Sequence, residues 1–215
     1  VLISIVINSC LLNEHKVEWR EYLGGADRNH YSSLSQIDTS NVSQLEKVWE
    51  FHTGDTSGQM QCNPIIADGL LFGSTASIEI FALNAATGKE VWRFRDVREE
   101  QWYSTNRRVA YWELGGDSRI LFSAGEWLYA LHAKTGKLVT SFGDSGRVSL
   151  KSGLGENAKD KFVIASTPGT IYRNSIIMPL RLSESTGAAP GYIQSFDVIT
   201  GKLKWVFKTI PDPEE

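Results

Sequence analysis

The sequence has few cysteines, no long apolar run and no excess of charge of either sign. Its 215 residues include only two cysteines, Cys10 and Cys62, which provide neither a disulfide framework nor a cluster of metal-binding thiolates. The formal net charge is −3, and acidic and basic residues are mixed along the chain rather than grouped in blocks, so nothing indicates a nucleic-acid partner. No segment has the periodicity of a sustained amphipathic helix. These absences argue against a disulfide-stapled domain, a cationic nucleic-acid-binding protein and a helical bundle.

The apolar stretch at the start of the chain, residues 1–10, is too short to cross a bilayer as a helix. It fits the tail of a secretory signal, and Ile-Asn-Ser-Cys at 7–10 resembles a bacterial lipoprotein cleavage box. Lipidation of Cys10, a plain export signal and a buried first strand stay open as interpretations. We expect residues 1–18 to be a truncated export or lipoprotein signal with a tether, which implies an exported protein of the bacterial periplasm with a lipid anchor as one option.

Three segments of the chain repeat one pattern, in which an apolar strand is followed by a turn ending in Thr-Gly-Lys. The glycines of these turns are Gly88, Gly136 and Gly201. In the first and third repeats a tryptophan, Trp92 or Trp205, follows the turn and can lie over the neighbouring unit, whereas the middle repeat has Thr140 there. Strand-turn-strand units that recur at roughly 40–50 residues are typical of propeller blades. We therefore predict blades, with the middle one sealed in another way.

Short strands separated by turn residues account for most of the chain after residue 46. The predicted strands are 47–51, 64–67, 70–73, 78–83, 90–94, 120–122, 127–131, 137–139, 163–165, 171–172, 175–180, 193–196 and 204–207. A β-sandwich is the alternative, because it too has short strands at regular spacing. The repeated turn favours an all-β propeller, so residues 19–215 are predicted to be about three blades of a propeller that is incomplete at its C-terminus.

Three further stretches strengthen a family resemblance that begins with the tryptophan-containing repeat. They are residues 19–37, residues 41–55 and the Asn-Arg-Arg-Val-Ala-Tyr-Trp segment at 106–112. Together they resemble the quinoprotein dehydrogenases, eight-bladed propellers with tryptophan-docking repeats that carry pyrroloquinoline quinone (PQQ), and in particular the membrane-bound glucose dehydrogenase branch. The resemblance runs from about Trp19 to the end of the chain.

The resemblance implies a set of PQQ-binding residues. Arg107 matches an arginine that contacts the carboxylate and carbonyl oxygens of the quinone, and a guanidinium suits a cofactor with three carboxylates; the alternative is an ordinary surface arginine. Gln61 stands where the family has a glutamate beside the quinone. Ser166 and Thr167 match a segment whose hydroxyl contacts it. Trp112 falls where some relatives have a histidine near the cofactor, and is otherwise a core aromatic.

The resemblance also implies Ca²⁺, which polarises a quinone carbonyl while an aspartate takes the proton of the substrate hydroxyl and a hydride passes to the quinone. Glu184 lies near the position of a family glutamate that binds this Ca²⁺, a sound ligand for a hard cation, and is otherwise a solvated loop acid. The catalytic base is expected beyond residue 215, so the catalytic residue is unknown and we expect this stretch alone to be inactive.

The function implied is therefore that of a PQQ-dependent dehydrogenase acting on a sugar or alcohol hydroxyl. A membrane quinone and cytochrome c are both open as the respiratory electron acceptor. The adjacent cysteines of the alcohol-oxidising branch would precede Asn106, where this chain has Gln-Trp-Tyr-Ser-Thr, and this favours sugars or polyols. The alternatives are a lipid-anchored propeller scaffold of the outer-membrane protein assembly type, which binds no quinone, and a family member that has lost its cofactor.

Overall fold

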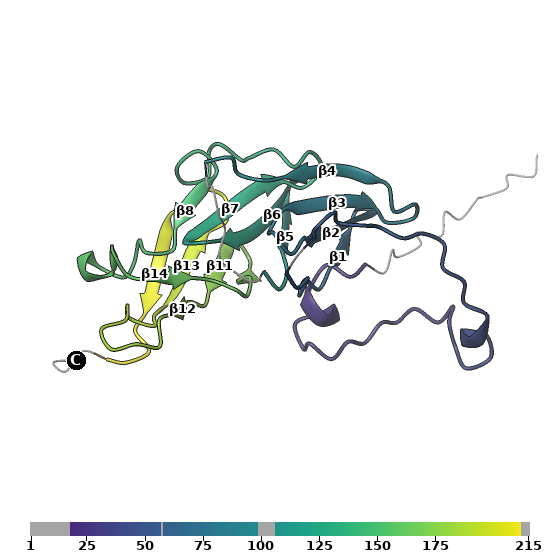
Figure 1. Ribbon diagram of the computed structural model, residues 1–215, viewed down its shortest axis with the longest axis horizontal. Coiled ribbons are helices and arrows are strands. Elements are labelled where there is room, and N and C mark those ends of the chain that lie inside the picture. Colours follow the sequence, from purple (N-terminus) through teal and green to yellow (C-terminus); the bar gives the residue numbers. More distant parts are fainter. Residues whose placement is uncertain (1–17, 57, 99–105, 212–215) are drawn as a thin grey trace, which may run out of the picture.

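The computed structural model describes residues 18–56, 58–98 and 106–211, and within them it places three four-stranded antiparallel sheets one after another along the chain (Figure 1). The first sheet contains β1 (Ile65–Ala67), β2 (Leu70–Ser74), β3 (Ile80–Asn84) and β4 (Glu90–Phe94); the second contains β5 (Ala110–Leu114), β6 (Asp117–Ala124), β7 (Trp127–His132) and β8 (Arg147–Ser149); the third contains β10 (Thr170–Tyr172), β11 (Ser175–Met178), β13 (Ile193–Asp197) and β14 (Leu203–Phe207). The predicted all-β architecture of three blades is confirmed.

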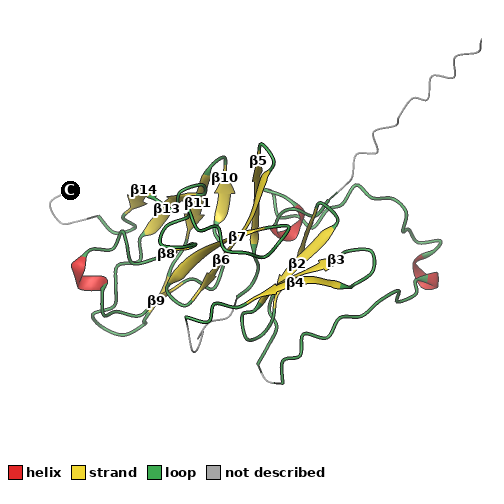
Figure 2. Cartoon of the chain, turned by 90° about the horizontal axis from the view of Figure 1, so that it is seen from above, coloured by secondary structure: helices red, strands yellow, loops and turns green. Residues whose placement is uncertain are grey.

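Few other regular elements occur in the described residues. A two-stranded sheet pairs β9 (Val163–Ile164) with β12 (Arg181–Leu182). Three short 3-10 helices complete the description: η1 (Tyr22–Gly24), η2 (Val42–Gln44) and η3 (Glu156–Ala158). Figure 2 shows that the N-terminal segment before β1 is almost wholly loop and runs outside the sheets.

The first two strands of each sheet form a tight hairpin whose loop has two residues. The loop between β1 and β2 is Asp68–Gly69, with φ of 51° and 74°, as the predicted turn requires. The corresponding loop of the second sheet begins at Gly115 and that of the third at Arg173, with φ of 58° and 53°. Each sheet therefore begins with the same local geometry, and the first strands of all three start from one region of the molecule.

The middle sheet is apolar on both faces because it is covered by a sheet on each side. In β6, Ile120 and Phe122 belong to the core shared with the first sheet, whereas Leu121 belongs to the core shared with the third. All three side chains are buried. This explains why β6 reads as a continuous apolar run in its centre rather than as an alternating strand.

The Thr-Gly-Lys turns are closed in the same way in all three sheets, by a hydrogen bond from the glycine N–H to the first residue of the turn. The acceptors are the carbonyl oxygens of Asn84, His132 and Asp197, at 2.9, 2.9 and 2.8 Å. The side chains of Asn84 and Asp197 also accept from backbone N–H groups within their turns. The middle turn has His132 at this position and is closed by backbone hydrogen bonds.

Tryptophans pack onto the glycines of these turns. Trp92 of β4 is buried, and its Nε1–H donates to the carbonyl oxygen of Ala133 at 2.8 Å, in the turn of the next sheet. Trp49 makes the same contact with the first turn, where its Nε1–H donates to Ala85 at 3.2 Å. The predicted docking of Trp92 is confirmed, and Trp49 adds a second case that the repeat had not indicated.

The middle blade is sealed without a tryptophan, as its Thr140 had predicted. Phe142 fills the core between the second and third sheets, and the backbone of Gly143 lies against Gly201. The Gly143 N–H donates to the carbonyl oxygen of Thr200 at 2.9 Å. A backbone segment therefore replaces the indole at this junction.

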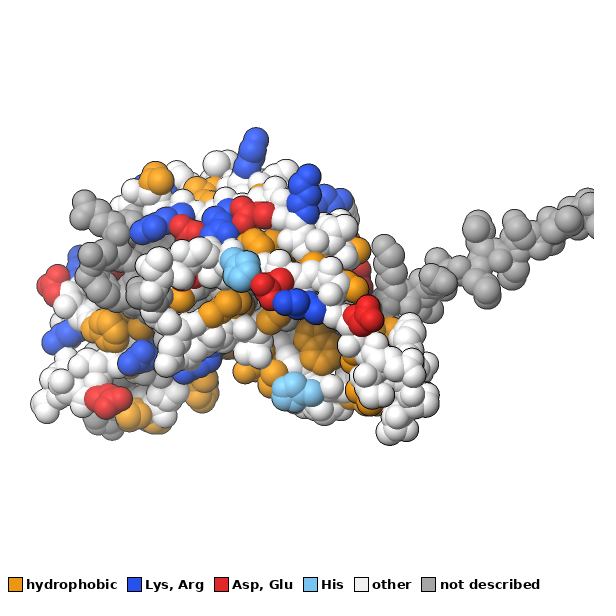
Figure 3. Space-filling model, turned by 45° about the vertical axis from the view of Figure 1, so that its right-hand side comes forward, with side chains coloured by type: hydrophobic (Ala, Val, Ile, Leu, Met, Phe, Trp, Pro, Cys, Tyr) orange, Lys and Arg blue, Asp and Glu red, His pale blue; other side chains and the backbone are white. Residues whose placement is uncertain are grey.

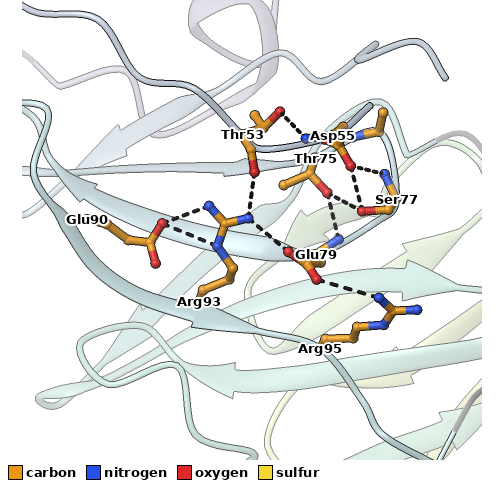
Figure 4. Close-up of polar contacts among 9 residues, drawn as sticks. Thr53, Asp55, Thr75, Ser77, Glu79, Glu90, Arg93 and Arg95 are labelled. Carbon is orange, nitrogen blue, oxygen red and sulfur yellow. Dashed lines mark hydrogen bonds and ion pairs between the residues drawn. The ribbon is translucent and has the colours of Figure 1, made fainter. Parts of the chain in front are cut away.

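A polar network holds the segment before β1 against the first sheet (Figure 4). The carboxylate of Asp55 accepts from the backbone N–H of Ala76 at 3.0 Å and from the hydroxyl of Ser77 at 2.7 Å. Arg93 donates to the carbonyl oxygen of Thr53 at 2.9 Å and forms an ion pair with Glu79 at 2.8 Å. The Thr-Gly-Asp stretch is therefore a structural clamp on the turn between β2 and β3.

Of the predicted strands, one is wrong as a paired strand and another pairs over a shorter length than expected. Residues 47–51 have no strand partner in the described residues, although their side chains alternate, with Val48 exposed and Trp49 half-buried. Residues 137–139 make one isolated bridge, between Leu131 and Leu138, and the outer strand of this sheet is β8. Residues 137–139 follow β7 only briefly, since the Val139 N–H donates to Ala130, and the chain then turns at Phe142, whose side chain fills the junction with the third sheet.

The exposed face drawn in Figure 3 mixes acidic and basic side chains with apolar ones and has no block of one sign. In the described part of the chain, no helix has the length and apolar character needed to span a membrane. The predicted signal and tether lies almost wholly outside the described residues.

Candidate functional site

Three segments far apart in the sequence lie side by side just before the first strands of the three sheets. The backbone N–H of Asn63 donates to the carbonyl oxygen of Arg107 at 2.8 Å. The N–H of Arg107 donates in turn to the carbonyl oxygen of Ser166 at 3.1 Å. Because β1, β5 and β10 all start from this row, the segments that contain Gln61, Arg107 and Ser166 form one surface.

Arg107 is exposed on this row, and its Nη1–H donates to the hydroxyl oxygen of Ser166 at 3.1 Å. No carboxylate of the described residues lies within ion-pair distance of it. The preceding residue, Asn106, is buried and fixes the backbone, since its Nδ2–H donates to Ser123 and its Oδ1 accepts from the N–H of Arg108. The buried asparagine therefore holds Arg107 outward with most of its donors available to a ligand.

The hydroxyl of Ser123 ties the second and third sheets together beneath this row. It donates to the carbonyl oxygen of Ala165 at 2.7 Å, one residue before Ser166. Ser166 is half-buried and Thr167 is exposed. Both hydroxyl residues thus lie at the same surface as Arg107, on a backbone that a buried hydrogen bond positions.

Gln61 is exposed at the other end of the row, and its amide donates to the side chain of Gln59 at 3.3 Å. The next residue, Cys62, is a free cysteine whose sulfur accepts from the N–H of Ser74 at 3.2 Å. Burial raises the pKa of the Cys62 thiol above its ordinary value. Cys62 therefore supports the backbone beside Gln61 and has the character of a packed thiol.

Trp112 lies further along β5, buried in the core between the second and third sheets. Its Nε1–H donates to the carbonyl oxygen of Arg173 at 3.1 Å, and the guanidinium of Arg119 lies 5.5 Å from its ring centre. The core interpretation accounts for this position, and the role beside a cofactor stays a prediction.

Glu184 is exposed in the loop after β12. Across the described ranges, no group of three or more histidine, cysteine, aspartate or glutamate side chains is placed to hold a metal ion. Glu184 therefore belongs to no such group within the described ranges, and its role as a Ca²⁺ ligand stays a prediction.

Arg108 occupies a position that the sequence did not predict. Its side chain is only 8% exposed, and its Nη2 donates to the carbonyl oxygens of Pro168 and Gly169 at 3.3 and 3.2 Å. Burial, together with the nearby charge of Arg28, lowers the pKa of Arg108 to about 10. The signal available in the sequence was an arginine where the resembled segment commonly has glycine.

The row combines a guanidinium, two hydroxyls and an amide on one exposed surface. A guanidinium fork binds a carboxylate through two parallel hydrogen bonds, and hydroxyls and amides donate to carbonyl or carboxylate oxygens. These donors suit a ligand that carries carboxylate or carbonyl oxygens. The absence of an acidic partner for Arg107 among the described residues is the structural observation that supports such a fit.

Comparison with known proteins identifies the family of this chain. Residues 19–215 match the family model of the PQQ group described as glucose/ethanol/alcohol dehydrogenase, β-propeller domain. The chain is 32% identical to quinate/shikimate dehydrogenase (quinone) of Acinetobacter baylyi, over 92% of this chain and 28% of that protein. It is 30% identical to quinoprotein glucose dehydrogenase of Escherichia coli, over 88% of this chain and 27% of that protein.

A solved structure supports the fold. Quinohemoprotein alcohol dehydrogenase from Comamonas testosteroni superposes with a TM-score of 0.75 at 23% sequence identity, over 93% of this chain and 28% of that one. The chain thus spans little more than a quarter of the length of the relatives it matches. On the family match over residues 19–215, the chain belongs to the β-propeller family of PQQ-dependent glucose, ethanol and alcohol dehydrogenases.

Proposed function

We propose that this chain is part of a PQQ-dependent dehydrogenase that oxidises a hydroxyl group of a sugar, polyol or alcohol. The observation that carries the proposal is the row in which Arg107 is exposed, hydrogen-bonded to Ser166 and without an acidic partner among the described residues. In this assignment Arg107 binds a carboxylate and a carbonyl oxygen of the quinone. Ser166, Thr167 and Gln61 donate further hydrogen bonds along the same edge.

When bound, the quinone accepts the hydride of the substrate alcohol, and the protein binds and orients it. The residues of this chain contribute positioning. Asn106 holds the Arg107 backbone through its bond to Ser123, and Ser123 holds the neighbouring Ser166 segment through Ala165. A Ca²⁺ ion with Glu184 among its ligands belongs to the same proposal, as does a catalytic base outside this chain.

The substrate class rests on a sequence feature and on relatives. The stretch before Asn106 lacks adjacent cysteines, and the relatives named above act on quinate or shikimate and on glucose. Sugars and polyols are therefore the preferred substrates. Export to the periplasm, with a respiratory quinone or cytochrome c as acceptor, rests on residues 1–10 and on the family resemblance.

The test is a quinone titration of the complete protein and of its Arg107→Ala variant, followed by equilibrium dialysis and quinone absorbance. Loss of the guanidinium leaves a cofactor carboxylate unpaired, at a cost of about 2–5 kcal/mol, so the affinity falls by roughly thirtyfold or more. Arg181→Ala, which removes an exposed arginine on β12, is the matched control and keeps the wild-type affinity.

Two results would count against the proposal in different ways. Equal quinone affinity in the wild type and the Arg107→Ala variant would show that the row is misassigned. A complete, folded protein that binds no quinone at all would favour the scaffold or a relative without its cofactor.

A further inference from the structure

A cavity of about 880 Å³ lies between the first strands of the second and third sheets and the N-terminal segment. Its walls come from β5, β10 and the stretch around Tyr22, and Figure 2 shows β5 and β10 side by side. Of the predicted cofactor residues, Trp112 alone lines this cavity. The wall is rich in arginine, with Arg28 and Arg108 on it.

Arg108 carries a buried positive charge that forms no ion pair in the described part of the chain, and the attraction of the nearby Glu21 offsets the cost of its burial only in part. Its hydrogen bonds come from Nη2 alone, to two backbone carbonyls, so Nε and Nη1 keep their donors. Its guanidinium lies 4.5 Å from the ring centre of Tyr22. A buried charge without an opposite partner is costly, because the hydration it has lost is not replaced.

Arg28 brings a second guanidinium to the same tyrosine ring, at 5.4 Å from its centre. It donates to the carbonyl oxygen of Tyr22 at 3.3 Å and to the hydroxyl of Thr170 at 3.4 Å. It too has no carboxylate within ion-pair distance among the described residues. The backbone of Arg28 has a φ of 55°, a conformation that residues other than glycine rarely adopt.

Arg20 also lines this cavity, and its positive charge is compensated by carboxylates. It forms ion pairs with Glu18, with Asp68 at 3.0 Å and with Glu113 at 2.6 Å. Glu113 is therefore already engaged. Glu21, the other acid on the wall, is near enough to attract Arg108 but forms no ion pair with Arg108 or Arg28. Two adjacent like charges with vacant donors, beside a third that is fully paired, indicate a place for an external anion.

We propose that this cavity binds a small oxyanion, the carboxylate of an organic acid or a phosphate group, between the guanidiniums of Arg108 and Arg28 and beside the ring of Tyr22. A guanidinium presents parallel donors that match either group, and an anion there would lower the cost of burying Arg108. The same contacts would tie the N-terminal segment to β5 and β10.

The test is calorimetric titration of the complete protein, free of quinone and at low ionic strength, with inorganic phosphate and, separately, with succinate. We expect saturable binding of at least one of them, weakened about tenfold or more by Arg28→Gln, which removes a charge-assisted hydrogen bond from a half-buried side chain. Binding of phosphate alone identifies a phosphate site, and binding of succinate alone identifies a carboxylate site. Arg181→Gln is the control and leaves the affinity unchanged.

Arg108→Gln should abolish the binding, and Arg28→Gln carries the test if Arg108→Gln does not fold. Absence of saturable binding of both anions, or equal binding in the wild type and the Arg28→Gln variant, overturns the proposal. In the complete protein, displacement of the anion by quinone would also overturn it, since the cavity would then be part of the cofactor site. If the Arg107→Ala variant loses quinone binding but keeps its affinity for the anion, the quinone site and the anion site are distinct.

Discussion

The indole of Trp92 lies directly over Gly136, so closely that a Cβ atom added to this glycine would be 2.5 Å from the ring carbon Cε3. The indole N–H completes the contact by donating to Ala133 in the same turn. One residue from the last strand of the first sheet and one from a turn of the second therefore interlock. This relationship explains why the Thr-Gly-Lys turn and a tryptophan recur together.

Trp92→Ala is expected to lower the free energy of unfolding of the chain by about 3–5 kcal/mol, because it empties a buried site and breaks the bond to Ala133. Trp205→Ala is the matched control at the equivalent position of the third repeat, where the side chain is 44% exposed, and it should cost less than about 1 kcal/mol. Urea unfolding of both variants measures the difference. Equal losses would show that docking onto the turn contributes little.

Gly136→Ala and Gly125→Ala separate the packing effect from backbone strain. Both glycines have positive φ, 67° and 55°, so each variant incurs the cost of a left-handed alanine, about 1–2 kcal/mol. A Cβ at Gly125 meets nothing within 4 Å, whereas one at Gly136 collides with Trp92. Thermal unfolding should therefore show Gly136→Ala clearly below Gly125→Ala. The same midpoint for both would remove the steric part of the argument.

Asp55→Asn tests the clamp between the N-terminal segment and the first sheet. Burial alone would raise the pKa of Asp55, but the hydrogen bonds from Ser77 and Ala76 outweigh it and hold the pKa below its ordinary value. A lowered folded pKa stabilises the protein above the unfolded pKa, near 3.9, and this stabilisation disappears as the pH falls through the folded value.

The Asp55→Asn variant is therefore expected to be less stable than the wild type by about 1 kcal/mol near pH 7, and this gap should be smaller at pH 3, which lies below the unfolded pKa. Urea unfolding at the two pH values measures it. Asp160→Asn, at an exposed position, is the control with no gap. A gap that stays constant with pH would show that the carboxylate charge is not involved.

Cys62 is expected to react slowly with alkylating agents. Since burial raises its thiol pKa, the reactive thiolate is scarce near neutral pH, and half-burial restricts access as well. In a Cys10→Ser background, the rate with iodoacetamide near pH 8 should be about tenfold or more below that of the same chain in urea. Equal rates in the two conditions would show an exposed, ordinary thiol.

The repeat pattern was sufficient to predict the architecture. Alternating apolar residues, the Asp-Gly hairpin at 68–69 and three Thr-Gly-Lys turns are local signals, because each depends on backbone geometry within a few residues. These local signals predict the strands less well where a contact between residues far apart in the sequence determines the course of the backbone. Residues 137–139 have a strand composition, yet the chain leaves the sheet there because Phe142 is needed at the junction with the third sheet.

The residue types of the candidate site were also readable from the sequence, since the segments containing Gln61, Arg107 and Ser166 carry the family resemblance. Their arrangement was not readable, because it depends on hydrogen bonds between Asn63, Arg107 and Ser166, residues separated by dozens of positions. The sequence by itself determined most of the strands, the turns and the residue types available to a cofactor. The tertiary structure alone decided that Arg107 is exposed while Arg108 is buried, because only packing of the third sheet against the second places Pro168 and Gly169 around the Arg108 guanidinium.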